Sequence, residues 1–299
     1  MFVPKRRVWI GAAALAWGGV LFFGILRPAW RRASADECPS CPAPAGVPDP
    51  VGEDGFTRLG PPQPGEWRWS FQEQEQTFER YVGGPVNRRC AHRSTIYFQP
   101  LGKASARYRE VLERMRTHAE AYFGVPARLL DPIPMAESAY AADRKQYQST
   151  LVLQALAGRR PPDALAVLGL TDQDLYAGGL NFVFGEGSLH ERCGVYSLRR
   201  LETPDEPLFL LRSLKLVCHE AGHILSIDHC TAWSCVMDGA NSLDEMDRQP
   251  LHLCPADLRK VLWNTGADRG GRYRRLHELY RSWGLTSESD WVAERLGLH

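Results

Sequence analysis

A segment that reads CHEAGHILSIDHC brings three histidines into a short stretch of chain. His219 and His223 lie on a predicted helix over residues 207–226, where apolar side chains recur at helical spacing. Residues four apart on a helix share one face, so both imidazoles can bind one ion. His229 can supply a third nitrogen if the chain turns back soon after Ser226. The spacing therefore predicts a three-histidine site with one open position, as in a catalytic zinc centre.

Glu220 directly follows the first of these histidines. Its position would let it reach a water molecule at the open zinc position rather than the metal itself. Zinc lowers the pKa of such a water to about 7 and polarises a substrate carbonyl. Glu220 would then take up the proton and pass it to the leaving amine of a peptide bond. We therefore predict a zinc metallopeptidase with Glu220 as its general base.

The HExxH pattern is a weak signal by itself, because three fixed positions arise by chance in many chains. A lone histidine on a helix is also usually a structural residue. Here the pattern falls on an independently predicted helix, and a third histidine follows at a suitable interval. Met237 lies eight residues beyond His229. Together these features favour the catalytic interpretation.

The spacing HExxHxxxxxH followed by a methionine resembles the metzincins, in which a tight turn carrying the methionine forms an apolar floor beneath the zinc ligands. Met237 matches that methionine. The resemblance implies the α+β fold class, as a metzincin-like zincin domain. We expect a small twisted mixed sheet, an active-site helix and a mainly helical C-terminal part.

Within the metzincins, the chain is similar to the archaemetzincins, a small family of zinc peptidases. The similarity rests on the stretches TIYFQPLG, LNFVFGEGSL, GVYSL and NSLDEMDRQPLHLCPADLRK, and on His229-Cys230, Cys235, Met237 and Cys254-Pro255. It extends over about residues 78–283. The resemblance also implies that LNFVFGEG, near residues 180–187, is the sheet edge along which an extended peptide would lie.

In the archaemetzincins, four cysteines bind a second, structural zinc. Cys230, Cys235 and Cys254 fall on three of these positions, and Asp257 occupies the fourth. A carboxylate can bind zinc, although closed structural sites favour Cys and His. A disulfide between Cys230 and Cys235 is the alternative in an oxidising compartment. His252 is a further candidate ligand, with a surface position as its more ordinary interpretation. The cofactor is thus one catalytic zinc, with a second zinc left open.

Ser226 is another departure from the family, which places a glycine there. Glycine permits the positive φ of a sharp turn toward the third ligand. Serine can adopt that conformation at a cost of about 1–3 kcal/mol, which is small beside zinc binding at about 10 kcal/mol or more. We therefore expect His229 still to reach the metal.

The rest of the domain alternates between strand-like and helical patterns. We expect helices at 105–123 and 149–157, and strands at 95–99, 125–130, 164–170, 181–184 and 195–198. The last two strands are predicted to flank a loop that contains Gly185, Gly187 and Gly194.

The N-terminus has the composition of a membrane segment. An uncharged, mostly apolar run of nineteen residues, 8–26, has three basic residues on each side. At about 1.5 Å per residue it nearly spans a hydrocarbon core of roughly 30 Å. Because Ala33-Ser34-Ala35 resembles a cleavage site, a signal peptide is the alternative. Residues 1–35 are thus predicted to be a single-pass anchor or a signal segment, with the catalytic domain outside the cytoplasm or secreted.

Residues 36–65 hold eight prolines and five glycines, which is typical of an extended, solvated linker. Cys38 and Cys41 lie in it as CPSC, where a local disulfide or idle thiols are more ordinary than a redox site. The globular peptidase domain is predicted over residues 66–299.

Three further cysteines have no ligand partner nearby in sequence. Cys218 is interpreted as a small core residue, because adjacent helical residues point about 100° apart. Cys90 and Cys193 are candidates for a disulfide or for thiolates over the zinc, and buried thiols are the more ordinary interpretation.

The charge balance of 36 basic and 35 acidic residues gives +1, so no long-range field gathers polyanions and nucleic acid is not an expected partner. We expect a monomer that acts on a peptide or protein substrate. The rival function is a non-catalytic, membrane-anchored zinc-binding sensor or interaction module, and Glu220 argues against it. A thiol-disulfide protein built on CPSC is a third alternative. The sequence identifies neither the substrate nor whether the chain acts as an endopeptidase or as an aminopeptidase.

Overall fold

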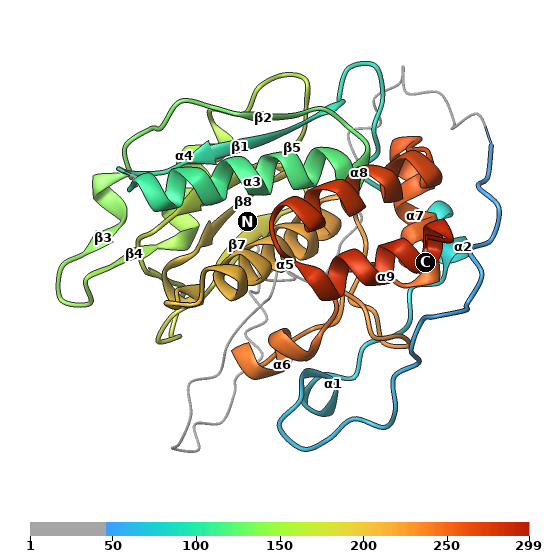
Figure 1. The fold of residues 1–299 in the computed structure, drawn as a ribbon. Helices are drawn as coiled ribbons and strands as arrows, with labels where there is room; N and C mark the ends of the chain where they lie inside the picture. The colour runs from blue at the N-terminus through green and yellow to red at the C-terminus, as the bar shows by residue number, and fades with distance from the viewer. Residues whose placement is uncertain (1–45, 104, 299) are drawn as a thin grey trace, which may run out of the picture.

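The computed structural model describes residues 46–103 and 105–298 (Figure 1). The predicted anchor or signal segment and the first ten residues of the predicted linker, 36–45, lie outside the described residues. None of the helices in these residues combines the length and the apolar composition needed to span a bilayer. The anchor and the membrane orientation stay predictions.

A five-stranded mixed sheet forms the centre of the domain (Figure 1). In spatial order, its strands are β2 (Ala127–Leu129), β1 (Thr95–Pro100), β5 (Ala164–Thr171), β8 (Cys193–Ser197) and β7 (Gly185–Ser188). The first four strands run parallel, and β7 pairs antiparallel with β8 at one edge. All residues of β1, β5 and β8 are buried, as expected for parallel strands covered on both faces.

Three helices cover the two faces of this sheet: α3 (Ala106–Phe123), α4 (Ser149–Ala157) and α5 (Glu206–Ile224). On one face, Phe98 and Leu168 belong to the core shared with α3 and α5. On the other face, Tyr97 and Val167 belong to the core shared with α4. Successive residues of a strand point to opposite faces, so each strand contributes to both cores. Packing against the sheet fixes α5, which carries the first two histidines.

The chain after α5 is mainly helical, as the metzincin resemblance implies (Figure 1). It contains α6 (Leu243–Arg248), α7 (Pro255–Thr265), α8 (Arg269–Ser282) and α9 (Thr286–Leu296). Two short helices precede the sheet: α1 (Trp67–Ser70) and α2 (Phe78–Val82). A small second sheet consists of β3 (Tyr140–Ala141), β4 (Gln146–Gln148) and β6 (Leu175–Tyr176). Two short 3₁₀ helices are also present, η1 (Glu137–Ala139) and η2 (Arg199–Leu201).

The predicted helices and most of the predicted strands are present, but the predicted strand at 181–184 and glycine loop are wrong. Gly185, Gly187 and Gly194 lie in β7 and β8 instead. A Cβ on Gly185 would lie 2.1 Å from the Tyr196 ring, and a Cβ on Gly194 would lie 2.0 Å from the Tyr196 hydroxyl. These two glycines therefore make room for an aromatic ring across the strands, whereas the sequence pattern suggested a turn.

Part of the predicted linker lies against the domain. The Leu59 amide donates to the Ala232 carbonyl at 3.0 Å, and the Ser234 amide donates to the Thr57 carbonyl at 2.8 Å. The Phe56 ring also packs against the Trp291 ring of α9. The expectation of a wholly solvated linker therefore fails for this stretch, because backbone hydrogen bonds hold it in place. The domain boundary at residues 65 and 66 stays a prediction.

Candidate active site and a second ligand cluster

His219 and His223 lie on successive turns of α5 with their Nε2 atoms 2.9 Å apart. Each ring is held through Nδ1 by a backbone carbonyl, Val236 O for His219 and Ile227 O for His223, both at 2.8 Å. A carbonyl only accepts, so each Nδ1 carries the proton and each Nε2 presents a lone pair. Burial lowers the pKa of His219 to about 3, which keeps the ring in the neutral, metal-binding form.

The chain leaves α5 through a sharp turn that brings His229 to the other two histidines. Ser226 has a φ of 71°, the left-handed conformation expected at this position. The ring centroid of His229 lies 5.2 Å from that of His219 and 4.7 Å from that of His223. The structure thus brings the three predicted ligands together.

The donor set of this site fits a divalent cation. One ring nitrogen of each histidine lies within 4.8 Å of the others. Two unprotonated Nε2 atoms face each other on His219 and His223, and buried lone pairs at this distance repel unless a positive group lies between them. His229 Nε2 is buried, with no hydrogen-bond partner among the described residues. Because a buried acceptor without a donor is costly, a cation bound by the three Nε2 atoms would stabilise the arrangement.

Met237 lies fully buried against the turn of α5 that separates the first two histidines. A Cβ on Gly222 would lie 2.5 Å from Met237 Sδ, so glycine allows this close approach. The Met237 carbonyl also accepts the Cys230 amide at 2.9 Å, which closes the loop after the third histidine. This is the place of the apolar floor implied by the metzincin resemblance.

Glu220 is buried on α5, with 4% of its surface exposed. Burial raises the pKa of Glu220 to about 8, and the neighbouring Tyr196 hydroxyl opposes this shift because it stabilises the carboxylate. A divalent cation nearby would also lower the pKa of Glu220. The sequence pattern identified Glu220, but nothing in it pointed to Tyr196.

We expect Tyr196→Phe to move the acidic limb of a pH–activity profile to higher pH. The substitution removes a group that lowers the Glu220 pKa, so a larger fraction of Glu220 stays protonated at a given pH. A protonated carboxyl cannot act as a base, so activity is lost on the acid side first. The measurement is kcat/KM against pH for both proteins. A limb that stays in place or moves to lower pH would contradict this role of Tyr196.

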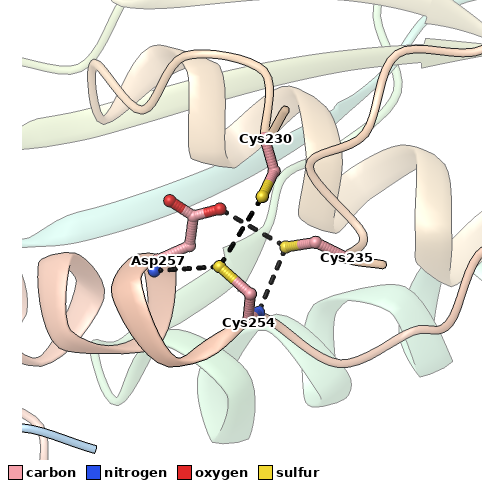
Figure 2. A group of neighbouring side chains, drawn as sticks. All are labelled: Cys230, Cys235, Cys254 and Asp257. Atoms are coloured by element: carbon pink, nitrogen blue, oxygen red, sulfur yellow. Dashed lines mark hydrogen bonds between the residues drawn. The ribbon is translucent and has the colours of Figure 1, made fainter. Parts of the chain in front are cut away.

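A second cluster of potential ligands lies beside the start of α7 (Figure 2). Its members are Cys230 and Cys235 from the loop after the third histidine, together with Cys254 and Asp257. One ligand atom of each lies within 4.8 Å of the others. Cys230 Sγ is 3.7 Å from Cys254 Sγ. Zn–S bonds of about 2.3 Å in a tetrahedron place sulfurs about 3.8 Å apart, so the cluster has the dimensions of a four-ligand site.

The cysteines of this cluster are free, so the alternative disulfide between Cys230 and Cys235 is not formed. Cys235 Sγ accepts the Cys254 amide at 3.1 Å, and it lies 3.3 Å from Asp257 Oδ2. The other carboxylate oxygen accepts Lys260 Nζ at 2.7 Å, and both of these side chains are buried. Lys260, which the sequence did not single out, thus compensates the charge that Asp257 brings into the cluster.

The other cysteines of the described residues, and His252, are not members of this cluster. The His252 ring stacks on the Trp291 ring at 3.9 Å and is not part of the ligand cluster. Cys218 is buried 3.6 Å from His118 Nδ1, in agreement with its interpretation as a core residue. Cys90 is disulfide-bonded whereas Cys193 is a free, buried thiol, so these two do not pair with each other.

Comparison with known proteins agrees with this fold. The family model for peptidase family M54 matches residues 96–262. Archaemetzincin-2 of Pongo abelii is 32% identical, over 71% of each chain. Archaemetzincin of Archaeoglobus fulgidus is 36% identical, over 56% of this chain and 98% of its own.

A solved structure supports the same assignment. The crystal structure of archaemetzincin from Methanopyrus kandleri superposes with a TM-score of 0.53 at 32% identity, over 59% of this chain and 97% of that one. The chain belongs to peptidase family M54, the archaemetzincins, and is a zinc metallopeptidase.

Proposed function

We propose that His219, His223 and His229 bind the catalytic zinc and that Glu220 is the general base for peptide-bond hydrolysis. The observation that carries this proposal is the meeting of three imidazoles whose Nε2 atoms have no proton to donate to one another. A structural site gains nothing from a buried carboxyl beside it. The pair of features therefore favours a catalytic centre over a zinc-binding module without activity.

The residues of the chain divide the chemistry between them. Zinc, when bound, polarises the substrate carbonyl and lowers the pKa of the attacking water. The Glu220 carboxylate accepts a proton from that water and donates it to the leaving amine nitrogen. Burial of Glu220 favours its protonated form. This helps Glu220 to hold the proton that it then donates to the leaving amine. The products are a new carboxylate and a free amine.

The edge strand β7 is the proposed binding site for the substrate backbone. It is one of the two edge strands of the main sheet and runs antiparallel to its neighbour β8. An edge strand can pair with an extended peptide through backbone hydrogen bonds. The proposed edge, β7 at Gly185–Ser188, overlaps the C-terminal part of residues 180–187, which the resemblance implies as the substrate edge.

We further propose that the cysteine cluster, with Asp257 as its fourth member, binds a structural zinc. The sulfur spacing and the burial of the cluster support this proposal. Cys230 and Cys235 lie in the loop that follows the third histidine, whereas Cys254 and Asp257 lie at the start of α7, so a bound ion would tie that loop to α7. Cys₃Asp is an unusual closed set, and Lys260 beside it would weaken the contribution of the carboxylate.

Metal analysis combined with a cleavage assay tests both sites. We expect the full chain to contain two zinc ions and to cleave members of a peptide library. Treatment with a chelator should abolish cleavage, because Glu220 alone does not supply the electrophile, and added zinc should restore it. Cys235→Ser should leave one zinc. Cleavage that survives complete zinc removal would overturn the mechanism, and one zinc in the unsubstituted chain would remove the second site.

A further inference from the structure

The segment 66–89 lies before the region that the family model matches, yet it contacts the turn that carries the third histidine. We propose that Glu73 is a positioning residue for His229, and that this segment is therefore part of the metal centre. The proposal rests on zinc binding by the three histidines. It adds to that function a residue whose carboxylate orients one ligand.

Glu73 determines which nitrogen of His229 faces the other histidines. Its Oε2 lies 2.7 Å from His229 Nδ1, and both side chains are largely buried. A carboxylate only accepts when it is ionised, so His229 carries its proton on Nδ1. The lone pair of Nε2 is then directed at the site. A carboxylate behind a metal-binding histidine also makes the ring a stronger ligand.

His229 differs from the other two histidines in this respect. His219 and His223 are oriented by neutral carbonyls of the loop that follows α5. His229 is oriented by a charged group from a segment 156 residues earlier in the chain. Its position therefore depends on whether that segment is docked.

Glu73 is itself held in place by Trp67. The indole Nε1 of Trp67 donates to Glu73 Oε2 at 3.0 Å, and the Trp67 amide donates to Glu245 Oε1 at 2.9 Å. The buried indole lies so close to Gly239 that a Cβ there would be 2.2 Å from the ring. Its ring also contacts the His229 ring edge-on at 5.0 Å. The carboxylate is thus fixed by a side chain that has little freedom to move.

The same segment grips the turn that precedes His229. The Tyr81 hydroxyl donates to the Leu225 carbonyl at 2.8 Å. The backbone amide of Asn87 donates to Ser226 Oγ at 2.9 Å. Gln76 Oε1 accepts the Asp228 amide at 3.1 Å. Ser226 is the residue with positive φ, and its hydroxyl makes a contact that glycine cannot make. The segment 66–89, which precedes the residues matched by the family model, therefore stabilises this strained turn.

The test measures zinc bound by the full chain at buffered free zinc concentrations, with no substrate present. We expect Glu73→Ala to lower the zinc affinity of the histidine site about 10- to 100-fold. Glu73→Gln keeps a neutral acceptor of the same size and should fall between Glu73→Ala and the wild type. Glu75→Ala is the matched control, because Glu75 is an exposed carboxylate two residues away. It should bind zinc as the wild type does.

His223→Ala provides the reference for a lost histidine site. If it keeps the zinc content of the wild type, the proposed catalytic site fails. If it loses one zinc while both Glu73 variants keep wild-type affinity, the positioning role of Glu73 fails alone. Circular dichroism checks folding, and Glu73→Gln carries the comparison if Glu73→Ala does not fold. The substitutions leave the cysteine cluster unchanged, so a difference from the wild type reports on the histidines.

Discussion

Glu220→Gln is expected to keep its zinc and to lose about 10²- to 10⁴-fold in kcat, the usual contribution of a general base. The amide has nearly the shape of the carboxyl, so the packing of α5 against the sheet is preserved. It cannot accept the proton of the attacking water. The measurement pairs zinc content with the rate of cleavage of one peptide from the library.

A carboxyl on another helix serves as the control for Glu220→Gln. Glu288 on α9 is also partly buried, and burial raises its pKa. Glu288→Gln removes a similar charge without touching the site, and it should leave kcat unchanged. If Glu220→Gln retained both zinc and full activity, the assignment of the base would be wrong. If it lost its zinc, Glu220 would be acting on the metal rather than on the water.

Lys260→Met is expected to destabilise the fold by about 3–5 kcal/mol at neutral pH, because it leaves a buried carboxylate without its partner. Lys260 and Asp257 are 2.7 Å apart, and their side chains are only 3% and 2% exposed. Burial raises the pKa of Asp257 even in the intact pair. The measurement is the free energy of unfolding from denaturant titration.

The deficit of Lys260→Met should depend on pH with a definite sign. Without Lys260 the folded-state pKa of Asp257 rises further, whereas an unfolded aspartate titrates near about 3.9. The folded variant then holds a proton that the unfolded chain releases, so its stability falls as pH rises above about 4. The deficit relative to wild type should shrink toward pH 4.

Arg114→Met is the matched control for that substitution. Arg114 forms an exposed ion pair with Glu110, and its loss should cost no more than about 1 kcal/mol. Equal small losses for both variants would show that Asp257 does not depend on Lys260 for charge compensation. A zinc ion bound at Asp257 would reduce the loss as well, and zinc content of the variant separates these two explanations.

The parts of the fold that sequence predicts best are those with strong local signals. The apolar period of α5 and the buried runs of β1 and β5 have the expected positions, since burial on one or two faces imposes those patterns. The three histidines were identified because metal binding requires fixed spacing on a helix and its following turn. The strand β7 was missed because GEGS carries a turn composition, and its glycines serve the ring of Tyr196.

The residues around the site could not be predicted for a different reason. Glu73, Tyr196 and Lys260 come from separate elements and approach their partners only in the folded chain. Each contact joins a single residue to a partner with which it forms no recognisable sequence motif. Residue spacing therefore does not predict these contacts. A carboxylate among many exposed carboxylates gives no sign that it will meet His229.

Anomalous diffraction at the zinc edge tests most directly whether three imidazoles share one zinc ion beside Glu220. We predict a peak about 2.0–2.1 Å from the Nε2 atoms of His219, His223 and His229. We also predict a coordination position on that ion that no protein atom occupies. A crystal of the active protein with no peak at the histidines, or with zinc only among the cysteines, would show that the catalytic zinc is not bound there.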